Sequence, residues 1–556
     1  QTDPTKAFNP FTRTFAVQNG TLVVTGDYQN PDSVISTFRA PYIRNGITKL
    51  GSADFRASGD VLSIWGGNVI GGAFGGEFRY EGYDDFRPPY VGVNPPDSGL
   101  DLTIGDFVSA SSRPDTHGNR HVASLYAETV IPLVGKQFRL PLVQSLELSG
   151  SARFESYTDF GSTTKPKIGI NWKPVSWIML RGSYNQGFHA PNLAELFTGT
   201  QISKLLGAQD SYRSIVTQLA TDSSTTLNSI GSGNKNLKPE TSTGRSAGIV
   251  IDVPKIKGLS LSVDYWEIRQ KDVIAAGGGI PDDSAALLAA TQAALASGQD
   301  INSIDLGSGT PTYKGDPSVV RLPVTQADKD AFAAYNVKQS PGNQRAVVGA
   351  ISYVKSTYFN KAQQFVNGFD FDLNYHVPET VLGIFTFDTN WALLNDFHSY
   401  NSAGAARTEL RGTNSPLAVG GADPRWRGTT TLSWHRKQWG AGVGLYYIGR
   451  YTDANATTSK TIYDSLGDPS YIQPVFSNGA FAYRYVVHDS KSYNVFVTYR
   501  LSVQNRWLND TSIRLGVDNV LNAQPPLASS SIGYDASVYN TMARGRVFSI
   551  QFTKRL

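Results

Sequence analysis

The chain has 556 residues, no cysteine, a formal net charge of +4 and a mean hydropathy of −0.26. The absence of cysteine excludes a disulfide scaffold and thiolate-ligated metal sites. The charge is too small for a typical nucleic-acid-binding domain, and no run of residues is apolar enough for a membrane-spanning helix.

The even spread of 54 glycines and the lack of a Pro/Ser-rich linker indicate one large body. A transmembrane β-barrel is compatible with the low mean hydropathy, because only alternate residues of each strand face lipid. The N-terminal residues 1–4 carry no basic region followed by an apolar stretch, as a signal peptide would. We therefore expect the chain to start at a mature terminus or at a break in a longer protein.

Apolar and polar residues alternate along most of the chain, which is the pattern of strands with two different faces. The clearest examples are residues 146–155, 259–266, 369–375 and 548–553. The alternation predicts about sixteen antiparallel strands. Their expected spans are 12–25, 50–62, 67–84, 119–132, 144–157, 163–173, 177–187, 241–253, 259–273, 364–375, 381–397, 424–435, 440–451, 490–501, 511–521 and 543–556. Most of these runs have the length that crosses a bilayer, about 9 to 11 tilted residues or more, whereas a soluble β-sandwich or propeller would have shorter strands.

Short turns alternate with long connections. The short turns lie near residues 173–176, 254–258, 377–380 and 435–438. The long segments are 188–240, 275–345, 399–423, 453–486 and 522–542. Short periplasmic turns and long extracellular loops are typical of outer-membrane barrels. Tryptophans at 172, 177, 434 and 439 flank two of the turns, where indole rings favour the membrane interface.

One short helix is expected in the longest loop, near residues 283–297. This segment is rich in alanine and leucine, which favour helices. Asp282 or Asp283 is the expected N-cap.

Four segments resemble motifs of the TonB-dependent receptor family. Residues 181–197, RGSYNQGFHAPNLAELF, are similar to its strand-to-loop motif, with His189 where the family usually has arginine. Residues 236–241, 515–522 and 545–548 resemble later motifs of the family, in family order. The motif residues to which the resemblance assigns a structural role are Arg181, Gly187, Phe188, Pro191, Leu196, Asn236, Pro239, Glu240, Asn519 and Phe548.

The resemblance implies an all-β fold, a transmembrane antiparallel β-barrel of about 22 strands around a plug. About 16 of these strands are expected in this chain, so that residues 1–556 form the C-terminal portion of one barrel domain. The plug and the TonB box are expected outside this chain, and the missing strands in the same gene product or another chain. The implied activity is TonB-dependent import of an iron chelate, a cobalamin or an oligosaccharide across the outer membrane of a Gram-negative-type bacterium. The implied partners are outer-membrane lipid, the TonB complex acting through the plug, and the imported ligand.

Two groups of residues are candidates for the substrate path. Polar residues on the inward face of the predicted strands are Arg181, Asn185, Asp264, Trp266, Asp370, Asp372, Asn374, Asp388 and Asn390. Loop tyrosines, which offer large contact areas, are Tyr90, Tyr212, Tyr313, Tyr400 and Tyr471. A large barrel also needs a polar interior for hydration and for holding its plug, so most of the inward residues are expected to be structural.

Three other functions are compatible with parts of the pattern. A passive porin with sixteen strands would explain the strand count without a plug. A surface adhesin would bind a partner without transport. A hydrolase at the barrel rim could use pairs such as His117 with His121 or His376 with Asp372, but the sequence has no Gly-x-Ser-x-Gly or His-Glu-x-x-His motif. We therefore expect no enzyme activity, no cofactor and no metal site.

Overall fold

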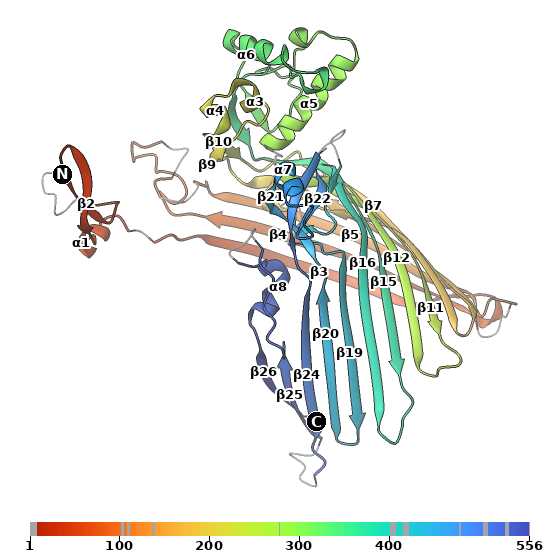
Figure 1. The fold of residues 1–556 in the computed structure, drawn as a ribbon. Coiled ribbons are helices and arrows are strands. Elements are labelled where there is room, and N and C mark those ends of the chain that lie inside the picture. Colours follow the sequence, from red (N-terminus) through yellow and green to blue (C-terminus); the bar gives the residue numbers. More distant parts are fainter. Residues whose placement is uncertain are drawn as a thin grey trace.

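A computed structural model describes residues 8–39, 41–101, 105–107, 112–135, 140–276, 279–400, 407–414, 422–477, 480–503, 510–528 and 533–554. Long antiparallel strands run side by side in one curved sheet, and the loops with most of the helices gather at one end of it (Figure 1). Within the described residues, no helix combines the length and apolarity needed to cross a membrane.

The large sheet has sixteen strands, fifteen of them in a continuous path. The path runs through β26 (Val547–Lys554), β25 (Thr511–Asp518), β24 (Ser490–Arg500), β20 (Trp439–Ile448), β19 (Trp426–Arg436), β16 (Ile384–Tyr400), β15 (Tyr358–His376), β12 (Leu259–Ala276), β11 (Glu240–Asp252), β8 (Ile178–His189), β7 (Gly161–Val175), β6 (Ser145–Tyr157), β5 (Thr116–Val134), β4 (Val69–Phe86) and β3 (Asn45–Ser63). The short β17 (Thr408–Glu409) pairs with β16 outside this path. Each of these fifteen strands overlaps one expected span, so the alternation located them correctly.

The expectation for residues 12–25 is wrong. They do not form a strand of the large sheet but most of a separate hairpin of β1 (Arg13–Gln18) and β2 (Thr21–Asp27). The chain reverses at Asn19 and Gly20, whose φ angles are 51° and 79°. Positive φ at both central residues is the signature of the type I′ turn, for which Asn-Gly is the preferred sequence. The sequence therefore contained the signal that divides this span.

The two faces of the large sheet differ in chemistry, because successive side chains of a strand point to opposite sides. One face carries exposed large apolar residues, including Phe78, Leu125, Ile168, Leu515 and Ile550, which are 54–60% exposed. The strand register places them all on the same side. A continuous exposed apolar surface of this kind marks contact with lipid or a partner. The opposite face carries charged and amide side chains in the middle of the strands, among them Arg181, Asp264 and Asp370, and is called the polar face below.

The long connections fold into two small units. In the first, a four-stranded sheet of β13 (Val319–Arg321), β14 (Ile351–Lys355), β10 (Thr225–Gly231) and β9 (Gln201–Ala208) packs with helices α3 (Ser214–Thr217), α4 (Ala220–Ser223), α5 (Ile280–Ala296) and α6 (Gln326–Asn336). It is called the loop domain, because the β8–β11 and β12–β15 connections build it together. The second unit is a sheet of β18 (Thr413–Asn414), β21 (Tyr451–Thr458), β23 (Ala480–Val487) and β22 (Ile472–Ser477).

The loops hold more helix than the single one expected. Besides α3 to α6, the chain forms α1 (Asp32–Ile35), α2 (Leu193–Phe197), α7 (Lys460–Ser465) and α8 (Ala536–Ala543). The expected helix near 283–297 corresponds to α5, but its N-cap is Gly279 rather than Asp282 or Asp283. Pro281 occupies the first turn, a position that suits proline and lets the helix begin earlier.

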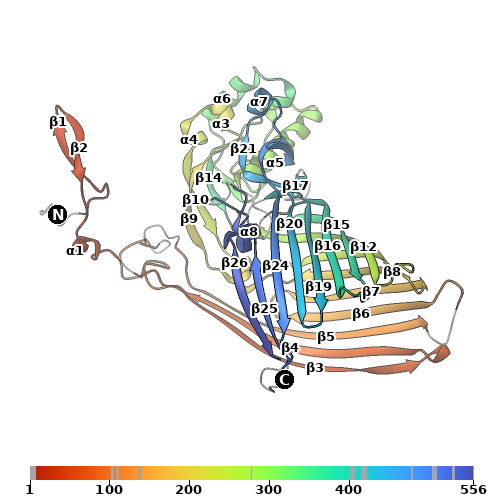
Figure 2. The same cartoon turned by 60° about the horizontal axis from the view of Figure 1, so that its bottom comes forward.

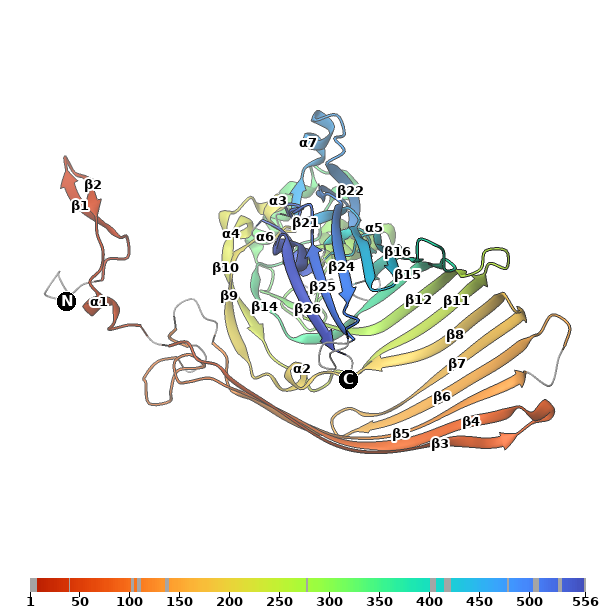
Figure 3. The same ribbon diagram turned by 90° about the horizontal axis from the view of Figure 1, so that it is seen from below.

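The sheet has two edges. Within the described residues, β3 and β26 do not pair with each other. In Figures 2 and 3 the sheet curls, while β3 and β4 extend away from the β24–β26 end and the N-terminal hairpin stands apart. The described strands therefore form an open, curved wall rather than a closed barrel.

Candidate functional site

The register brings charged residues from distant parts of the chain into one lateral row. Arg181 of β8 lies opposite Gly248 of β11, which lies opposite Asp264 of β12, and Asp264 lies opposite Asp370 of β15. The same alternation puts the other inward candidates on this polar face: Asn185, Trp266, Asp372, Asn374, Asp388 and Asn390. The shared face of these nine residues follows from the alternation alone.

An ion pair spans three strands within this row. The Nε of Arg181 donates to Oδ1 of Asp264 at 2.7 Å, and its Nη2 contacts Oδ2 of the same carboxylate. Gly248 lies between them, and a Cβ there would be 1.9 Å from Oδ1 of Asp264. The missing side chain on β11 is therefore what allows the guanidinium and the carboxylate to meet.

A groove of about 680 Å³ opens on the polar face, between the sheet and α8. It brings together Asp370, Asp372 and Asn390 from the predicted set. Other side chains that line it are Arg427, Tyr446, Asn494, Asp518, Tyr539 and Arg544. Its volume falls in the range of small-molecule sites, about 300–1,000 Å³, and its carboxylates, amides and guanidinium groups can hydrogen-bond a polar solute.

The helix α8 is fixed over the groove by packing and capping. Tyr539 is 1% exposed and stacks on Tyr451 at a ring-centroid distance of 6.4 Å. The N-cap Asp535 accepts a hydrogen bond from the backbone N–H of Ser537 at 3.0 Å. Burial raises the pKa of Tyr539 to about 12, so the phenol is neutral at physiological pH. α8 therefore forms a wall of the groove.

Part of the groove was missed by the sequence analysis. Arg427, Tyr446 and Asn494 lie on predicted strands with the parity of the polar face, so the signal for them was present. The α8 residues lie in the segment predicted only as a long loop, where no periodic pattern indicates that it folds inward.

The loop tyrosines are placed differently, and none lines the groove. Tyr212 is completely buried in the loop domain and donates a hydrogen bond to the carbonyl of Ala346 at 2.9 Å. Tyr313 donates to Oδ1 of Asp283 at 2.6 Å. Tyr90 and Tyr471 are both 45% exposed, and Tyr400 packs edge-on against His398. In this conformation, Tyr212 has no ring surface available to a ligand.

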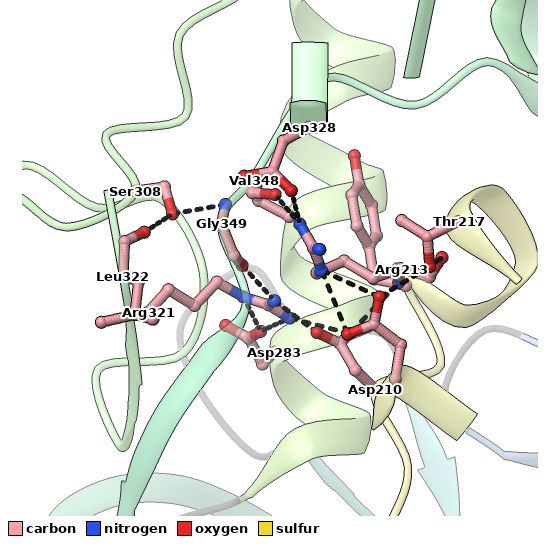
Figure 4. Close-up of polar contacts among 12 residues, drawn as sticks. Asp210, Arg213, Thr217, Asp283, Ser308, Arg321, Leu322, Asp328, Val348 and Gly349 are labelled. Atoms are coloured by element: carbon pink, nitrogen blue, oxygen red, sulfur yellow. Dashed lines mark hydrogen bonds and ion pairs between the residues drawn. The ribbon is translucent and has the colours of Figure 1, made fainter. Parts of the chain in front are cut away.

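A buried ion network holds the loop domain together (Figure 4). The side chain of Arg321 is 0% exposed and lies between Asp210 and Asp283, with N–O distances of 3.0 Å and 2.8 Å. Arg213 donates to Asp328 at 2.8 Å and to the carbonyl of Val348 at 2.6 Å. Charged groups thus join α5, which contains Asp283, to α6, which contains Asp328, and they link the β8–β11 and β12–β15 connections. Asp283 belongs to this network and does not cap α5.

The motif residues lie where strands end and loops begin. Asn192 and Glu195 form a capping box at the start of α2, and Leu196 of this helix is 3% exposed. The carbonyl of Pro191 accepts a hydrogen bond from Arg120 at 2.7 Å. Nδ1 of His189 lies 3.4 Å from a carboxylate oxygen of Glu240, whose other oxygen accepts from the backbone N–H of Ile274 at 2.7 Å.

The remaining motif residues occupy similar positions. Gly187 and Phe188 belong to the end of β8, opposite Ser242 and Thr241. Asn236 and Pro239 lie in the segment that leads into β11. Asn519, at a φ of 51°, follows β25, and Phe548 lies on the apolar face of β26.

The histidines considered for catalysis do not line the groove, although Asp372, the proposed partner of His376, does. His117 and His121 are on the apolar face of β5, where His117 contacts Asp84 at 3.1 Å and His121 stacks on Phe78. His376, at the end of β15, contacts Thr386 at 3.2 Å.

Comparison with known proteins gives one family and a consistent group of folds. The family described as "TonB dependent receptor-like, beta-barrel" matches residues 4–520. No curated protein matches the sequence significantly.

Two solved structures illustrate the similarity in fold. The siderophore receptor PirA from Acinetobacter baumannii has a TM-score of 0.52 and 16% identity, over 90% of this chain and 54% of that one. A mutant of the ferric enterobactin receptor PfeA from Pseudomonas aeruginosa, in complex with enterobactin, has a TM-score of 0.53 and 14% identity, over 90% and 54%. The chain thus spans about half the length of these structures.

Proposed function

Because the chain belongs to the TonB-dependent receptor-like β-barrel family, we propose that it forms most of the wall and the outer loops of an active nutrient importer. The importer acts in the outer membrane of a Gram-negative-type bacterium. Its cargo is a bulky nutrient: an iron chelate, a cobalamin or an oligosaccharide.

The observation that carries this proposal is the groove under α8. It lies on the polar face of a sheet whose other face is apolar and exposed, so it is separated from lipid and open to water. The helix α8 that covers it supports a binding site for a solute rather than a wide water-filled pore. The predicted path residues Asp370, Asp372 and Asn390 supply carboxylate and amide groups to it.

Further strands are proposed to complete the barrel. A strand edge in lipid leaves backbone N–H and C=O groups without partners, at a cost of several kcal/mol each. Within the described residues, β3 and β26 both present such edges. We infer that strands from the same gene product or another chain pair with these edges, and that a plug fills the lumen and couples it to TonB.

Among the cargo classes, an iron chelate is the first to test. PirA is described as a siderophore receptor, and the PfeA structure contains enterobactin. The similarity of this chain to PirA and PfeA is in the fold, and the ligands named are those of PirA and PfeA. Cobalamin and a linear oligosaccharide are therefore tested beside a ferric catecholate.

The test uses the full-length receptor in its own bacterium. Uptake of radio-iron-labelled enterobactin, labelled cobalamin and labelled maltodextrin is measured with and without collapse of the proton gradient. The double variant Asp370→Asn/Asp372→Asn should weaken binding of maltodextrin about tenfold, or ~1.4 kcal/mol, because its hydroxyl groups lose two carboxylate acceptors in the groove. It should strengthen binding of the anionic ferric enterobactin, because two negative charges are removed. The control Asp54→Asn removes an exposed carboxylate on β3, far from the groove, and should leave binding unchanged.

The results separate the proposal from its rivals. An importer accumulates one probe only while the gradient is present. Continued uptake after its collapse would indicate a passive porin, and binding without uptake would indicate an adhesin.

A further inference from the structure

We propose that the apolar face of the sheet carries a binding site for a phosphorylated, acylated lipid of the outer leaflet. The site has two adjoining parts: an apolar groove across β12 to β19 and an arginine pocket above it. It lies on the face opposite to the solute groove, and it is independent of which nutrient is imported.

The apolar groove has a volume of about 410 Å³. Leu261, Val263, Phe371, Leu373, Trp391 and Trp426 line it. Strand register and alternation place these side chains on the apolar face. A depression in a lipid-facing surface is filled by acyl chains, because water there would have no polar partners.

Trp391, Phe371 and Trp426 form the aromatic wall of this groove. Trp391 lies across Gly428, where a Cβ would be 2.3 Å from Cδ2 of the indole. Its Nε1 donates to the hydroxyl of Thr389 at 2.8 Å, so the only polar group of the ring is satisfied within the protein. Phe371 stacks on Trp426 at a centroid distance of 6.1 Å. Trp391 and Phe371 therefore present an apolar surface with no free donor to an acyl chain.

The arginine pocket adjoins the groove at Trp426, which lines both. It has a volume of about 560 Å³, and Arg411, Arg425 and Arg450 contribute to its wall. The two carboxylates of the pocket, Glu409 and Asp489, already contact Arg407 at 3.2 Å and Lys491 at 3.6 Å.

The charge of this pocket favours an anion. Arg425 and Arg450 are exposed and form no ion pair within the part of the chain that the structure describes. Guanidinium groups bind phosphate oxygens through paired hydrogen bonds, which makes arginine the preferred partner of phosphate groups. A phosphate is therefore the expected ligand at this end of the site.

The height of the site in the membrane agrees with a lipid ligand. β19 has 11 residues and runs from Trp426 to Arg436 at the short turn. At about 3.3 Å per residue and a tilt of about 45°, Trp426 lies roughly 23 Å above Arg436, close to the thickness of the apolar band of an outer-membrane barrel, about 25 Å. The arginines then lie level with the headgroups of the outer leaflet, and the groove lies at the depth of the acyl chains.

The test measures lipid that copurifies with the full-length receptor. The receptor is extracted from its own outer membrane in mild detergent and analysed by native mass spectrometry. The double variant Arg425→Gln/Arg450→Gln removes the charges, and Arg425→Lys/Arg450→Lys keeps them without the paired hydrogen bonds. The control Arg436→Gln/Lys437→Asn removes two charges from the same pair of strands at the opposite end; asparagine suits position 437, whose φ is 52°.

We expect a phosphorylated, acylated lipid on the unaltered receptor and on the control. Its occupancy should fall about tenfold in the glutamine variant, because the charge-assisted hydrogen bonds to phosphate are lost. It should fall less in the lysine variant, because lysine keeps the charge and loses only the paired geometry of the guanidinium hydrogen bonds. Circular dichroism verifies that all variants keep their strand content. The proposal is overturned if the glutamine variant retains the lipid fully, if the bound lipid carries no phosphate, or if millimolar inorganic phosphate displaces it.

Discussion

At the scale of single residues, the ion pair on the polar face depends on a glycine that leaves room between the two charged side chains. Arg181 reaches Asp264 only across Gly248, and the sequence alone indicated that the two charges share a face but not that they touch. Alternation gives the face of a residue, whereas contact between strands depends on register. Register is set by pairings between residues far apart in the chain.

Gly248→Ala should break this ion pair. The added Cβ overlaps the Asp264 carboxylate, and overpacking of this kind typically costs about 1–3 kcal/mol. The control Gly444→Ala adds a methyl group on the same face, where the nearest atom is 3.7 Å away. Unfolding midpoints of the full-length receptor should fall for Gly248→Ala only, and equal midpoints would show that the ion pair can rearrange at no cost.

The buried phenol of Tyr212 should make the loop domain sensitive to alkali. Burial raises its pKa to about 12, above the ordinary value of about 10. Between these values the unfolded state has lost a proton that the folded state keeps, so stability falls as pH rises through this window and is unaffected below it.

Tyr212→Phe tests this effect. Absorbance titration of the tyrosines near 295 nm, where phenolate absorbs, should lose one group titrating near pH 12 in the variant. The control is Tyr471→Phe at an exposed position, which should leave the absorbance change near pH 12 as it is in the unaltered receptor. Tyr539 also titrates near pH 12, so the amplitude there should fall by one group in Tyr212→Phe. An unchanged amplitude in Tyr212→Phe, or a reduced one in Tyr471→Phe, would contradict the assignment.

At the level of elements, the two longest loops form one folded unit rather than two separate segments. α5 and α6 pack around a core that includes Tyr212, Leu287 and Phe332. Helix propensity located α5 approximately, but no local pattern indicated that the β8–β11 and β12–β15 loops share a core. Such packing joins residues more than a hundred positions apart, beyond the range of any periodicity.

Arg321→Ala should open this unit. It leaves Asp210 and Asp283 as buried carboxylates without their cation, and breaking a buried pair in this way costs about 3–5 kcal/mol. Hydrogen exchange of residues 280–354 in the full-length receptor should become faster, while the strands of the large sheet remain protected. Lys329→Ala, at an exposed position of α6, is the control and should change nothing. Protection that survives Arg321→Ala would show that the apolar core alone holds the unit.

The element that the sequence analysis misplaced shows the limit of periodicity. Residues 12–25 alternate well enough to suggest one strand, yet Asn19-Gly20 divides them into two. The long strands were easier to locate, because a chain that crosses a bilayer must keep apolar residues on one face over its full length. A short hairpin carries no such constraint, and its turn residues are the better guide.

At the scale of the whole molecule, the sheet is a curved wall with a polar and an apolar face. Both faces and fifteen strand positions follow from the sequence, because the two-residue period is set by local geometry. The inward position of α8 and the pairing at the two edges depend on contacts that no local pattern encodes. We propose that this wall belongs to a larger, plugged barrel.

A cryo-EM structure of the intact receptor, isolated from outer membranes, would show whether the barrel is completed and plugged. We expect additional strands hydrogen-bonded to β3 and to β26, and a folded domain inside the lumen next to the groove under α8. Direct pairing of β3 with β26 around an empty lumen would contradict it and indicate a passive porin.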